Sequence, residues 1–310
     1  MDTVVLGRTG LKVTSSGLGC GGFSRAGIRY GLEHASGIVR AAYDMGVTFF
    51  DTAAAYGSQP AVGHGLRGLK RDSYTLSTKF TYRGKDGDVI SPEQMLASLH
   101  TSLRELETDC IDIFHIHALV ASDFPRVRDS LLPELLRAKE QGKFRFLGLT
   151  ERFGSDTGHD MLNLVIPEDL FDVVMVGYNI LNPSAAKAVL PLAVKNNLGV
   201  LCMYAVRKAL WDREQLKKDL LKIIDSGQGG AVLNERSLDF LMQEQIAQSL
   251  PEAAYRFCRH TPGIDVTLTG TGNREHLSEN LRSLDMPKLP DWALERLREL
   301  FEHVDCVSGQ

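Results

Sequence analysis

Two periodicities of hydrophobic residues alternate along the chain. Short runs rich in β-branched and aromatic residues, typical of buried strands, are followed by longer amphipathic stretches typical of helices. The predicted strands cover residues 16–20, 47–50, 74–79, 111–116, 144–149, 172–176, 200–204 and 264–269. The predicted helices cover residues 33–46, 59–69, 91–106, 127–140, 184–196, 273–281 and 292–304, with a longer tract, broken once or twice, over 213–259.

Eight strand–helix units in 310 residues favour an α/β fold of the (β/α)8 TIM-barrel type over an open doubly wound sheet. Residues 4–6 and 11–13, separated by a Gly-Arg-Thr-Gly turn, predict a small β-hairpin before the barrel. An extra helix is expected at the C-terminal end. Because no Pro- or Ser-rich linker interrupts the pattern, we expect residues 1–310 to form one domain.

The composition limits the classes of molecule that this chain is expected to bind. With a formal net charge of −4 and a pI of about 6.2, the chain has no basic excess that predicts a nucleic-acid or anionic-membrane partner. No apolar run approaches the ~20 residues of a membrane span, and no signal peptide is expected at the N-terminus. Five scattered cysteines without a CxxC pair indicate reduced thiols in the cytoplasm. The oligomeric state is left open.

Reactive side chains collect at the predicted strand ends, where barrels of this type carry their active sites. The second strand runs directly into the stretch FFDTAAAYG, with Asp51 at its end and Tyr56 five residues on. Taken alone, this stretch also fits a helix-capping Asp51 and a Tyr56 hydroxyl in water. The other strand ends carry Lys79, His117, Thr150 with Glu151, Tyr204, and Gly270-Thr271-Gly272.

These side chains suit acid–base work on a carbonyl group. A phenol is a poor acid or base at neutral pH, but a neighbouring ammonium favours the phenolate and lowers its pKa. We therefore expect Lys79, held by Asp51, to lower the pKa of Tyr56, and His117 to orient a carbonyl oxygen. Such a site has no electron source of its own, so hydride must come from a cofactor.

Two further motifs each have more than one interpretation. The run from Gly17 to Gly22 satisfies GxGxxG, but no helical pattern follows, so we predict a strand whose glycines allow a close approach to its backbone. His115 and His117 share one face of a strand, a spacing that also suits the metal of a barrel hydrolase. The other strand ends lack further metal ligands, so we expect no metal site and predict that His115 is a buried, hydrogen-bonded residue.

The motifs FFDTAAAYG, LSTK, IDIFHIH, FLGLT and GTGNREHLSENL resemble those of the aldo-keto reductase superfamily, in order and over essentially the whole chain. The resemblance implies an enzyme that uses NAD or NADP. It also implies a catalytic tetrad in which Tyr56 donates or accepts the proton, Lys79 and Asp51 tune it, and His117 orients the substrate.

The same resemblance implies a set of cofactor-binding positions. Thr150 is expected at the nicotinamide carboxamide, Tyr204 against the nicotinamide ring, and residues 270–280 at the adenosine end and its phosphates. Arg207 is expected either at a cofactor phosphate or, with Lys208, in a solvated loop. The full expected set is Gly19, Cys20, Gly21, Asp51, Thr150, Glu151, Met175, Tyr204, Arg207, Gly270, Thr271, Gly272, Arg274, Glu279 and Asn280.

The chain also departs from the family pattern. Thr150-Glu151 replaces a common Ser-Asn pair, and an ionised Glu151 only accepts hydrogen bonds where an amide also donates them. Met175 stands at the position of a usual Gln. A single arginine, Arg274, after the eighth strand leaves the choice between NAD and NADP open.

The segments DCIDIFHIHALV and LPELLRAKEQGKFRFLGLT are similar to the sugar-oxidising branch, the L-galactose and related aldose 1-dehydrogenases. This similarity implies oxidation of a cyclic sugar to a lactone, with Tyr56 as base. Two functional hypotheses follow: an oxidoreductase acting on small carbonyl compounds or sugars, and a nicotinamide-binding sensor or regulatory barrel with little turnover. The loops 80–88, 118–125 and 207–234 are expected to select the substrate.

Overall fold

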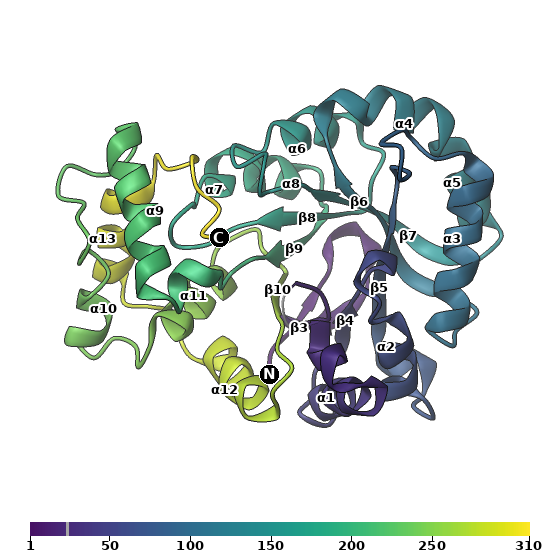
Figure 1. The fold of residues 1–310 in the computed structure, drawn as a ribbon, viewed down its shortest axis with the longest axis horizontal. Coiled ribbons are helices and arrows are strands. Elements are labelled where there is room, and N and C mark those ends of the chain that lie inside the picture. Colours follow the sequence, from purple (N-terminus) through teal and green to yellow (C-terminus); the bar gives the residue numbers. More distant parts are fainter. Residues whose placement is uncertain (23–24) are drawn as a thin grey trace.

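Eight parallel strands close into a barrel in the order β10-β3-β4-β5-β6-β7-β8-β9, which confirms the predicted fold. We describe residues 1–22 and 25–310 of the protein in a computed structural model (Figure 1). The barrel strands are β3 (Ser16–Gly19), β4 (Phe49–Asp51), β5 (Thr75–Thr81), β6 (Ile111–Leu119), β7 (Phe144–Glu151), β8 (Val173–Gly177), β9 (Gly199–Met203) and β10 (Val266–Thr269).

The predicted hairpin is formed by β1 (Thr3–Val5) and β2 (Lys12–Thr14), which pair antiparallel. Its apolar side chains Leu6, Leu11 and Val13 belong to one buried cluster with residues of the barrel strands, among them Phe49 and Met175. The hairpin therefore packs against the barrel through apolar side chains. Met175, on β8, extends this cluster toward the carboxyl ends of the strands.

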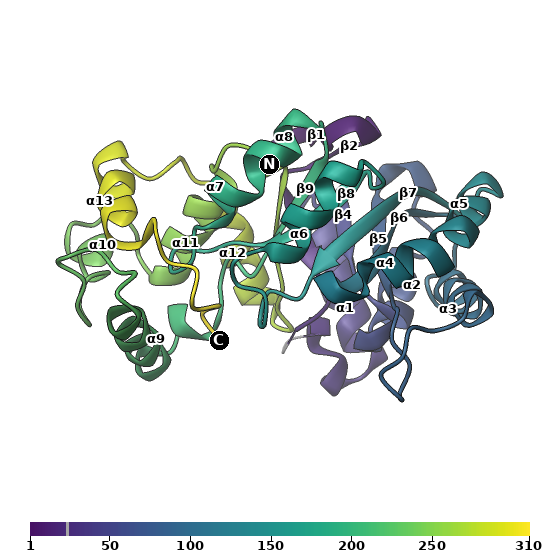
Figure 2. The ribbon, with the colours of Figure 1, turned by 90° about the horizontal axis from the view of Figure 1, so that it is seen from above.

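Helices surround the barrel (Figures 1 and 2). They are α1 (Leu32–Asp44), α2 (Gln59–Leu66), α3 (Pro92–Glu105), α4 (Phe124–Ser130), α5 (Leu132–Glu140), α6 (Asp160–Val165), α7 (Ala185–Ala188), α8 (Leu190–Lys195), α9 (Arg213–Ser226), α10 (Phe240–Gln243), α11 (Leu250–Arg259), α12 (Arg274–Asp285) and α13 (Asp291–Phe301). Within the described residues, none of them combines the length and the apolar character that crossing a membrane requires.

Two helices predicted as continuous are each divided. The stretch 127–140 falls into α4 and α5, and 184–196 falls into α7 and α8. The second member of each pair has a proline in its first turn, Pro133 and Pro191. Proline has no N–H to donate to the preceding turn, so the division lies just before it.

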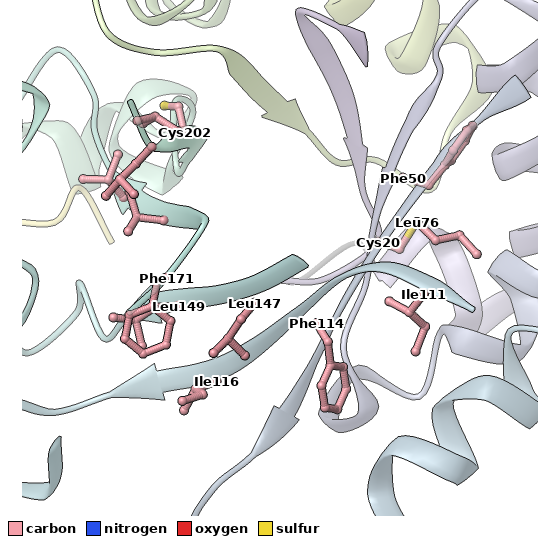
Figure 3. Packing of buried hydrophobic residues seen from close by; sticks show 14 of the residues in the cluster. Cys20, Phe50, Leu76, Ile111, Phe114, Ile116, Leu147, Leu149, Phe171 and Cys202 are labelled. Carbon is pink, nitrogen blue, oxygen red and sulfur yellow. The ribbon is translucent and has the colours of Figure 1, made fainter. Parts of the chain in front are cut away.

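Apolar side chains form a large cluster between the strands and the surrounding helices, which includes Phe50, Leu76, Phe114 and Leu147 (Figure 3). A second cluster draws mainly on α9, α10, α11 and α13, which follow β9, together with Ile180 and Leu181 from the segment after β8. These helices form a lobe to one side of the barrel (Figures 1 and 2). The long segment after β9 thus has apolar packing of its own.

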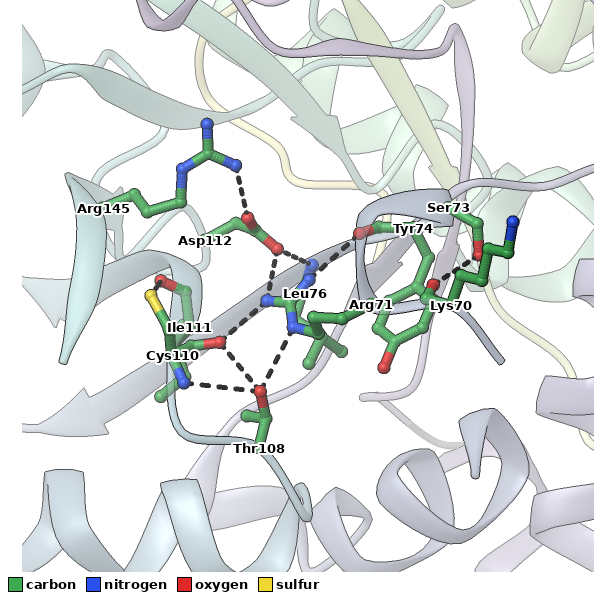
Figure 4. A network of polar contacts seen from close by, with 10 residues as sticks. All are labelled: Lys70, Arg71, Ser73, Tyr74, Leu76, Thr108, Cys110, Ile111, Asp112 and Arg145. Carbon is green, nitrogen blue, oxygen red and sulfur yellow. Dashed lines mark hydrogen bonds and ion pairs between the residues drawn. The ribbon is translucent and has the colours of Figure 1, made fainter. Parts of the chain in front are cut away.

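Asp112, near the start of β6, holds neighbouring elements together through its side chain (Figure 4). Its carboxylate accepts from Arg71 at 2.7 Å, from Arg145 at 2.9 Å and from the backbone N–H of Leu76 at 2.8 Å. The side chain of Asp112 is 3% exposed, so water does little to replace these partners. This network stabilises the entry of the chain into β5, β6 and β7.

We expect Asp112→Ala to lower the free energy of unfolding by about 2 kcal/mol, because it leaves a backbone N–H and two guanidinium groups without their acceptor. Urea denaturation followed by circular dichroism measures the change. Asp109→Ala is the matched control, since Asp109 is exposed and its loss is expected to cost less than about 0.5 kcal/mol. Equal effects of the two substitutions would contradict this role for Asp112.

Candidate active site

A buried ion pair joins the ends of β4 and β5. The Lys79 Nζ lies 2.6 Å from Asp51 Oδ2 and also donates to the Thr52 carbonyl at 2.7 Å. The two charged side chains are only 1% and 5% exposed. Burial raises the pKa of Asp51, while Lys79 and Ser77 oppose the rise through their contacts with it. The pair is enclosed by hydrogen bonds, the condition under which a buried charge is tolerated.

A second chain of contacts supports Asp51 from the other side. The Ser77 hydroxyl donates to Asp51 Oδ1 at 2.7 Å, and its oxygen lies 3.0 Å from His115 Nε2. Because the serine proton is used on the carboxylate, His115 Nε2 is the donor of the second bond. His115 is fully buried, which confirms the prediction made for it. A Cβ at Gly148 would lie 2.1 Å from its Nδ1, so only glycine leaves room for the imidazole ring.

Sequence reasoning missed Ser77. The available signal was its position two residues before Lys79 on the same strand, which places both side chains on one face.

Tyr56 and His117 meet beside this ion pair. The phenol oxygen lies 3.2 Å from His117 Nε2, and the Lys79 Nζ lies 5.1 Å from the centre of the Tyr56 ring. The glycine-rich β3 segment makes this placement possible, because a Cβ at Gly21 would lie 2.4 Å from the Tyr56 ring. The expected close approach to these glycines is therefore made, at least in part, by the tyrosine.

The expected lowering of the Tyr56 pKa is wrong for this structure. Burial raises the pKa of the phenol, and the negative charge of Asp51 raises it further. The main physical reason is the burial of the phenol. In addition, Asp51 lies 2.6 Å from Lys79, so the carboxylate offsets the ammonium that was expected to favour the phenolate. Burial and the positive charge of Lys79 lower the pKa of His117 to about 3. At neutral pH the site therefore presents a protonated phenol and a neutral imidazole.

A cavity of about 210 Å³ opens on these groups. It is lined by eight of the residues predicted from the sequence: Tyr56, Lys79, His117, Thr150, Glu151, Met175, Tyr204 and Arg207. It is also lined by Phe153 and by Ala118, which begins the loop 118–125 expected to select the substrate. Arg152, Gly154 and Met203 complete the lining and were not predicted as site residues.

The two residues that replace the usual Ser-Asn pair behave differently. The Thr150 oxygen accepts from the backbone N–H of Ala118 at 2.7 Å, which leaves its own proton available to a ligand. The Glu151 carboxylate instead accepts from the Gly177 N–H at 2.6 Å and pairs with His159 Nδ1 at 2.8 Å. Glu151 is thus held by interior partners on both oxygens, and Thr150 is the better placed of the two to donate to a carboxamide.

Tyr204 follows β9 in the left-handed backbone region, with φ of +67°, and its side chain is 36% exposed. The Arg207 guanidinium carbon lies 3.9 Å from the centre of its ring. The Phe153 ring lies 6.2 Å from Tyr204 and 5.5 Å from His159, close to parallel with both. Phe153 is 1% exposed, so it packs as well as lines the cavity.

The remaining predicted cofactor residues lie elsewhere. Gly19, Cys20 and Gly21 follow one another at the end of β3, where the Cys20 N–H donates to the Asp51 carbonyl at 2.7 Å. The second group follows β10 and does not belong to the cavity lining: Gly270, Thr271, Gly272, Arg274, Glu279 and Asn280. In that group, Asn280 donates to the Thr269 hydroxyl at 3.0 Å.

The two histidines of the HxH motif are both engaged by protein groups, His115 by Ser77 and His117 by Tyr56. Across residues 1–22 and 25–310, no cluster of three or more His, Cys, Asp or Glu side chains is arranged to hold a metal ion.

Comparison with known proteins identifies the family. A model described as the aldo/keto reductase family matches residues 17–302. The chain belongs to this family. L-galactose dehydrogenase of Arabidopsis thaliana is 35% identical over 150 residues, a match that spans about half of each protein, 47% of this chain and 47% of the relative. The aldo-keto reductase YhdN of Bacillus subtilis (strain 168) is 27% identical over 308 residues, covering 90% of this chain and 88% of that one.

A solved aldo-keto reductase, AKR11C1 from Bacillus halodurans in its holo form, superposes with a TM-score of 0.75. It is 20% identical and covers 99% of this chain and 98% of its own. This likeness confirms the fold, and the family match confirms the resemblance predicted from the motifs.

In this aldo/keto reductase, we expect the carbon-bound imidazole protons of His117 not to titrate between about pH 5 and pH 8. The reason is the pKa of about 3 set by burial and Lys79. Proton NMR across this range measures the titration, with His117→Asn identifying the resonance and free histidine as the reference. A His117 midpoint close to that of the free amino acid would contradict the buried, neutral imidazole.

Proposed function

We propose that the protein is an NAD- or NADP-dependent oxidoreductase that interconverts carbonyl compounds with alcohols, or aldoses with lactones. The observation that carries this proposal is the separation of 3.2 Å between Tyr56 Oη and His117 Nε2 beside the buried Lys79–Asp51 pair. Two polar atoms so close together both reach one carbonyl oxygen, at normal hydrogen-bond distances.

The protonation states favour reduction. Burial keeps the Tyr56 phenol protonated, so it is ready to donate to a carbonyl oxygen that gains negative charge. A neutral His117 with its proton on Nε2 donates to the same oxygen and orients it. After the proton leaves Tyr56, Lys79 is the nearby cation that stabilises the phenolate, and Asp51 keeps that ammonium in position.

The residues at the cavity fit a nicotinamide, which supplies or accepts the hydride when it is bound. The Thr150 hydroxyl has a free proton for the carboxamide oxygen, and Tyr204 offers a partly exposed aromatic ring. Met175 adds an apolar wall. The segments 19–21 and 270–280 are proposed to contact the rest of the dinucleotide, including Arg274, Glu279 and Asn280. Nothing in this set of side chains separates NAD from NADP.

A small sugar is the proposed substrate class. Support comes from the 35% identity to a protein named L-galactose dehydrogenase. All five cysteines are free thiols, in keeping with the proposed cytoplasmic location.

We expect Tyr56→Phe to lower kcat by about 10²- to 10⁴-fold, because it removes only the proton donor. Affinity for the cofactor is expected to change little. Stopped-flow measurement of cofactor oxidation with aldehydes, and of cofactor reduction with aldoses, gives the rates, and fluorescence titration gives the affinity. Tyr43→Phe is the control, since the Tyr43 hydroxyl contacts Ser73, away from the cavity. Full turnover by Tyr56→Phe would refute the acid–base role.

A further inference from the structure

Two arginines give the cavity a positive charge that the proposed hydride transfer does not use. Arg152 and Arg207 both line the cavity that holds Tyr56 and His117. Throughout the described chain, neither guanidinium forms an ion pair with a carboxylate within 4.0 Å. Arg152 is exposed, whereas Arg207 is partly buried. A partly buried guanidinium that faces a cavity without a carboxylate partner attracts an anionic ligand.

The other charged groups of the cavity are already balanced. The Lys79 ammonium is paired with Asp51 at 2.6 Å. The Glu151 carboxylate is turned to the Gly177 N–H and His159, and its side chain is fully buried. The uncompensated charge facing a ligand therefore comes from the two arginines.

Arg207 is the more enclosed of the two. Its Nε is buried and has no hydrogen-bond partner among residues 1–22 and 25–310. Burial lowers the pKa of the guanidinium. Asp219 on α9 is a carboxylate whose charge acts on Arg207, but it lies beyond ion-pair distance, and its Oδ1 accepts from Gln215 Nε2 at 3.1 Å. Its own Oδ2 is also buried without a partner.

The loop that carries Arg207 is held in place before any ligand arrives. The guanidinium lies over the Tyr204 ring at 3.9 Å, a cation–π contact. The backbone N–H of Ala209 donates to the Gly309 carbonyl at 3.0 Å, and a Cβ at Gly309 would lie 3.1 Å from the Arg207 Cβ. The C-terminal residues thus pack against the Arg207 side chain, and a preorganised cation loses little freedom on binding.

We propose that Arg207, assisted by Arg152, binds an anionic group on the substrate, either a carboxylate or a phosphate monoester. This proposal rests on the proposed function and narrows its substrate class to small acidic aldehydes or acidic sugars. The position of Arg207 favours a substrate group over the cofactor diphosphate, because Arg207 shares one small cavity with Tyr56 and His117. An anionic group bound there is close to the carbonyl that these two residues orient.

The experiment compares matched substrates with and without the charge, using each reduced cofactor. The pairs are succinic semialdehyde with butanal, and glyceraldehyde 3-phosphate with glyceraldehyde, which separate carboxylate from phosphate. We expect the charged member of at least one pair to have a kcat/KM about tenfold or more above its neutral partner. In Arg207→Met this advantage, measured as the ratio of kcat/KM for the charged compound to kcat/KM for its neutral partner, is expected to disappear. Arg207→Lys is expected to retain part of it.

The control variant is Arg213→Met, because Arg213 is 83% exposed and lies outside the cavity lining. It is expected to keep the wild-type preference. The proposal is overturned if neither pair shows a preference for the charged compound, or if Arg207→Met retains that preference. It is also overturned if kcat/KM of Arg207→Met falls equally for charged and neutral substrates while its cofactor affinity weakens. That result is expected if Arg207 binds the cofactor diphosphate.

Calorimetry with succinate and with inorganic phosphate tests the anion site without turnover. If these anions bind to the wild-type protein and not to Arg207→Met, the anion site is supported. If no carbonyl compound or sugar is converted in addition, only the oxidoreductase proposal fails. Conversion of neutral aldehydes without any binding of these anions or preference for charged substrates leaves the oxidoreductase standing and removes the anion site.

Discussion

The contact between Lys79 and Asp51 is the constraint on which the site depends. Removing an ammonium and a carboxylate from water costs several kcal/mol for each, so both need close partners on every side. Thr52 supplies a carbonyl to the ammonium, while Ser77 supplies a hydroxyl to the carboxylate and links it to His115. The need to satisfy one buried pair thus fixes the ends of β4 and β5 and aligns β6 beside them.

The same contact sets the chemistry of the neighbours. The negative charge of Asp51 offsets the positive charge of Lys79. Burial is therefore the main influence on the pKa of the Tyr56 phenol, and it keeps the phenol protonated. Burial also keeps His117 neutral, with Lys79 adding to the effect. Two neutral donors beside a balanced ion pair are suited to stabilise negative charge that develops on a carbonyl oxygen.

Much of this arrangement was predictable from the sequence because it follows local periodicity. The apolar strand runs located β4, β5 and β6, and a barrel brings the ends of those strands together, so Asp51, Lys79 and His117 were expected at one site. Tyr56, five residues after Asp51 in the same stretch, was expected at this site as well, and the family resemblance identified the four residues as a catalytic tetrad. The proline-driven breaks before Pro133 and Pro191 were also visible in principle, since a proline in the first turn marks a new helix.

Other features depend on contacts between residues distant in sequence or on side-chain direction. The Glu151 side chain meets His159 and Gly177 because the loop after β7 folds back. No local sequence pattern predicts this path of the loop. The pKa of Tyr56 depends first on the burial of its phenol and then on the nearby charge of Asp51, and local sequence patterns give neither. The exposure of Arg207 to the cavity depends on the packing of the C-terminal residues against its loop.

The most direct test of the central claim follows the hydrogen that is transferred. Reduced cofactor carrying deuterium at C4 of the nicotinamide, mixed with the protein and an aldehyde in ordinary water, is expected to yield an alcohol with one deuterium on the former carbonyl carbon. The hydroxyl proton is expected to come from Tyr56 and exchange with solvent. Mass spectrometry and NMR of the product locate the label. An alcohol without deuterium, or no alcohol with either cofactor across aldehydes and sugars, would contradict hydride transfer at this site.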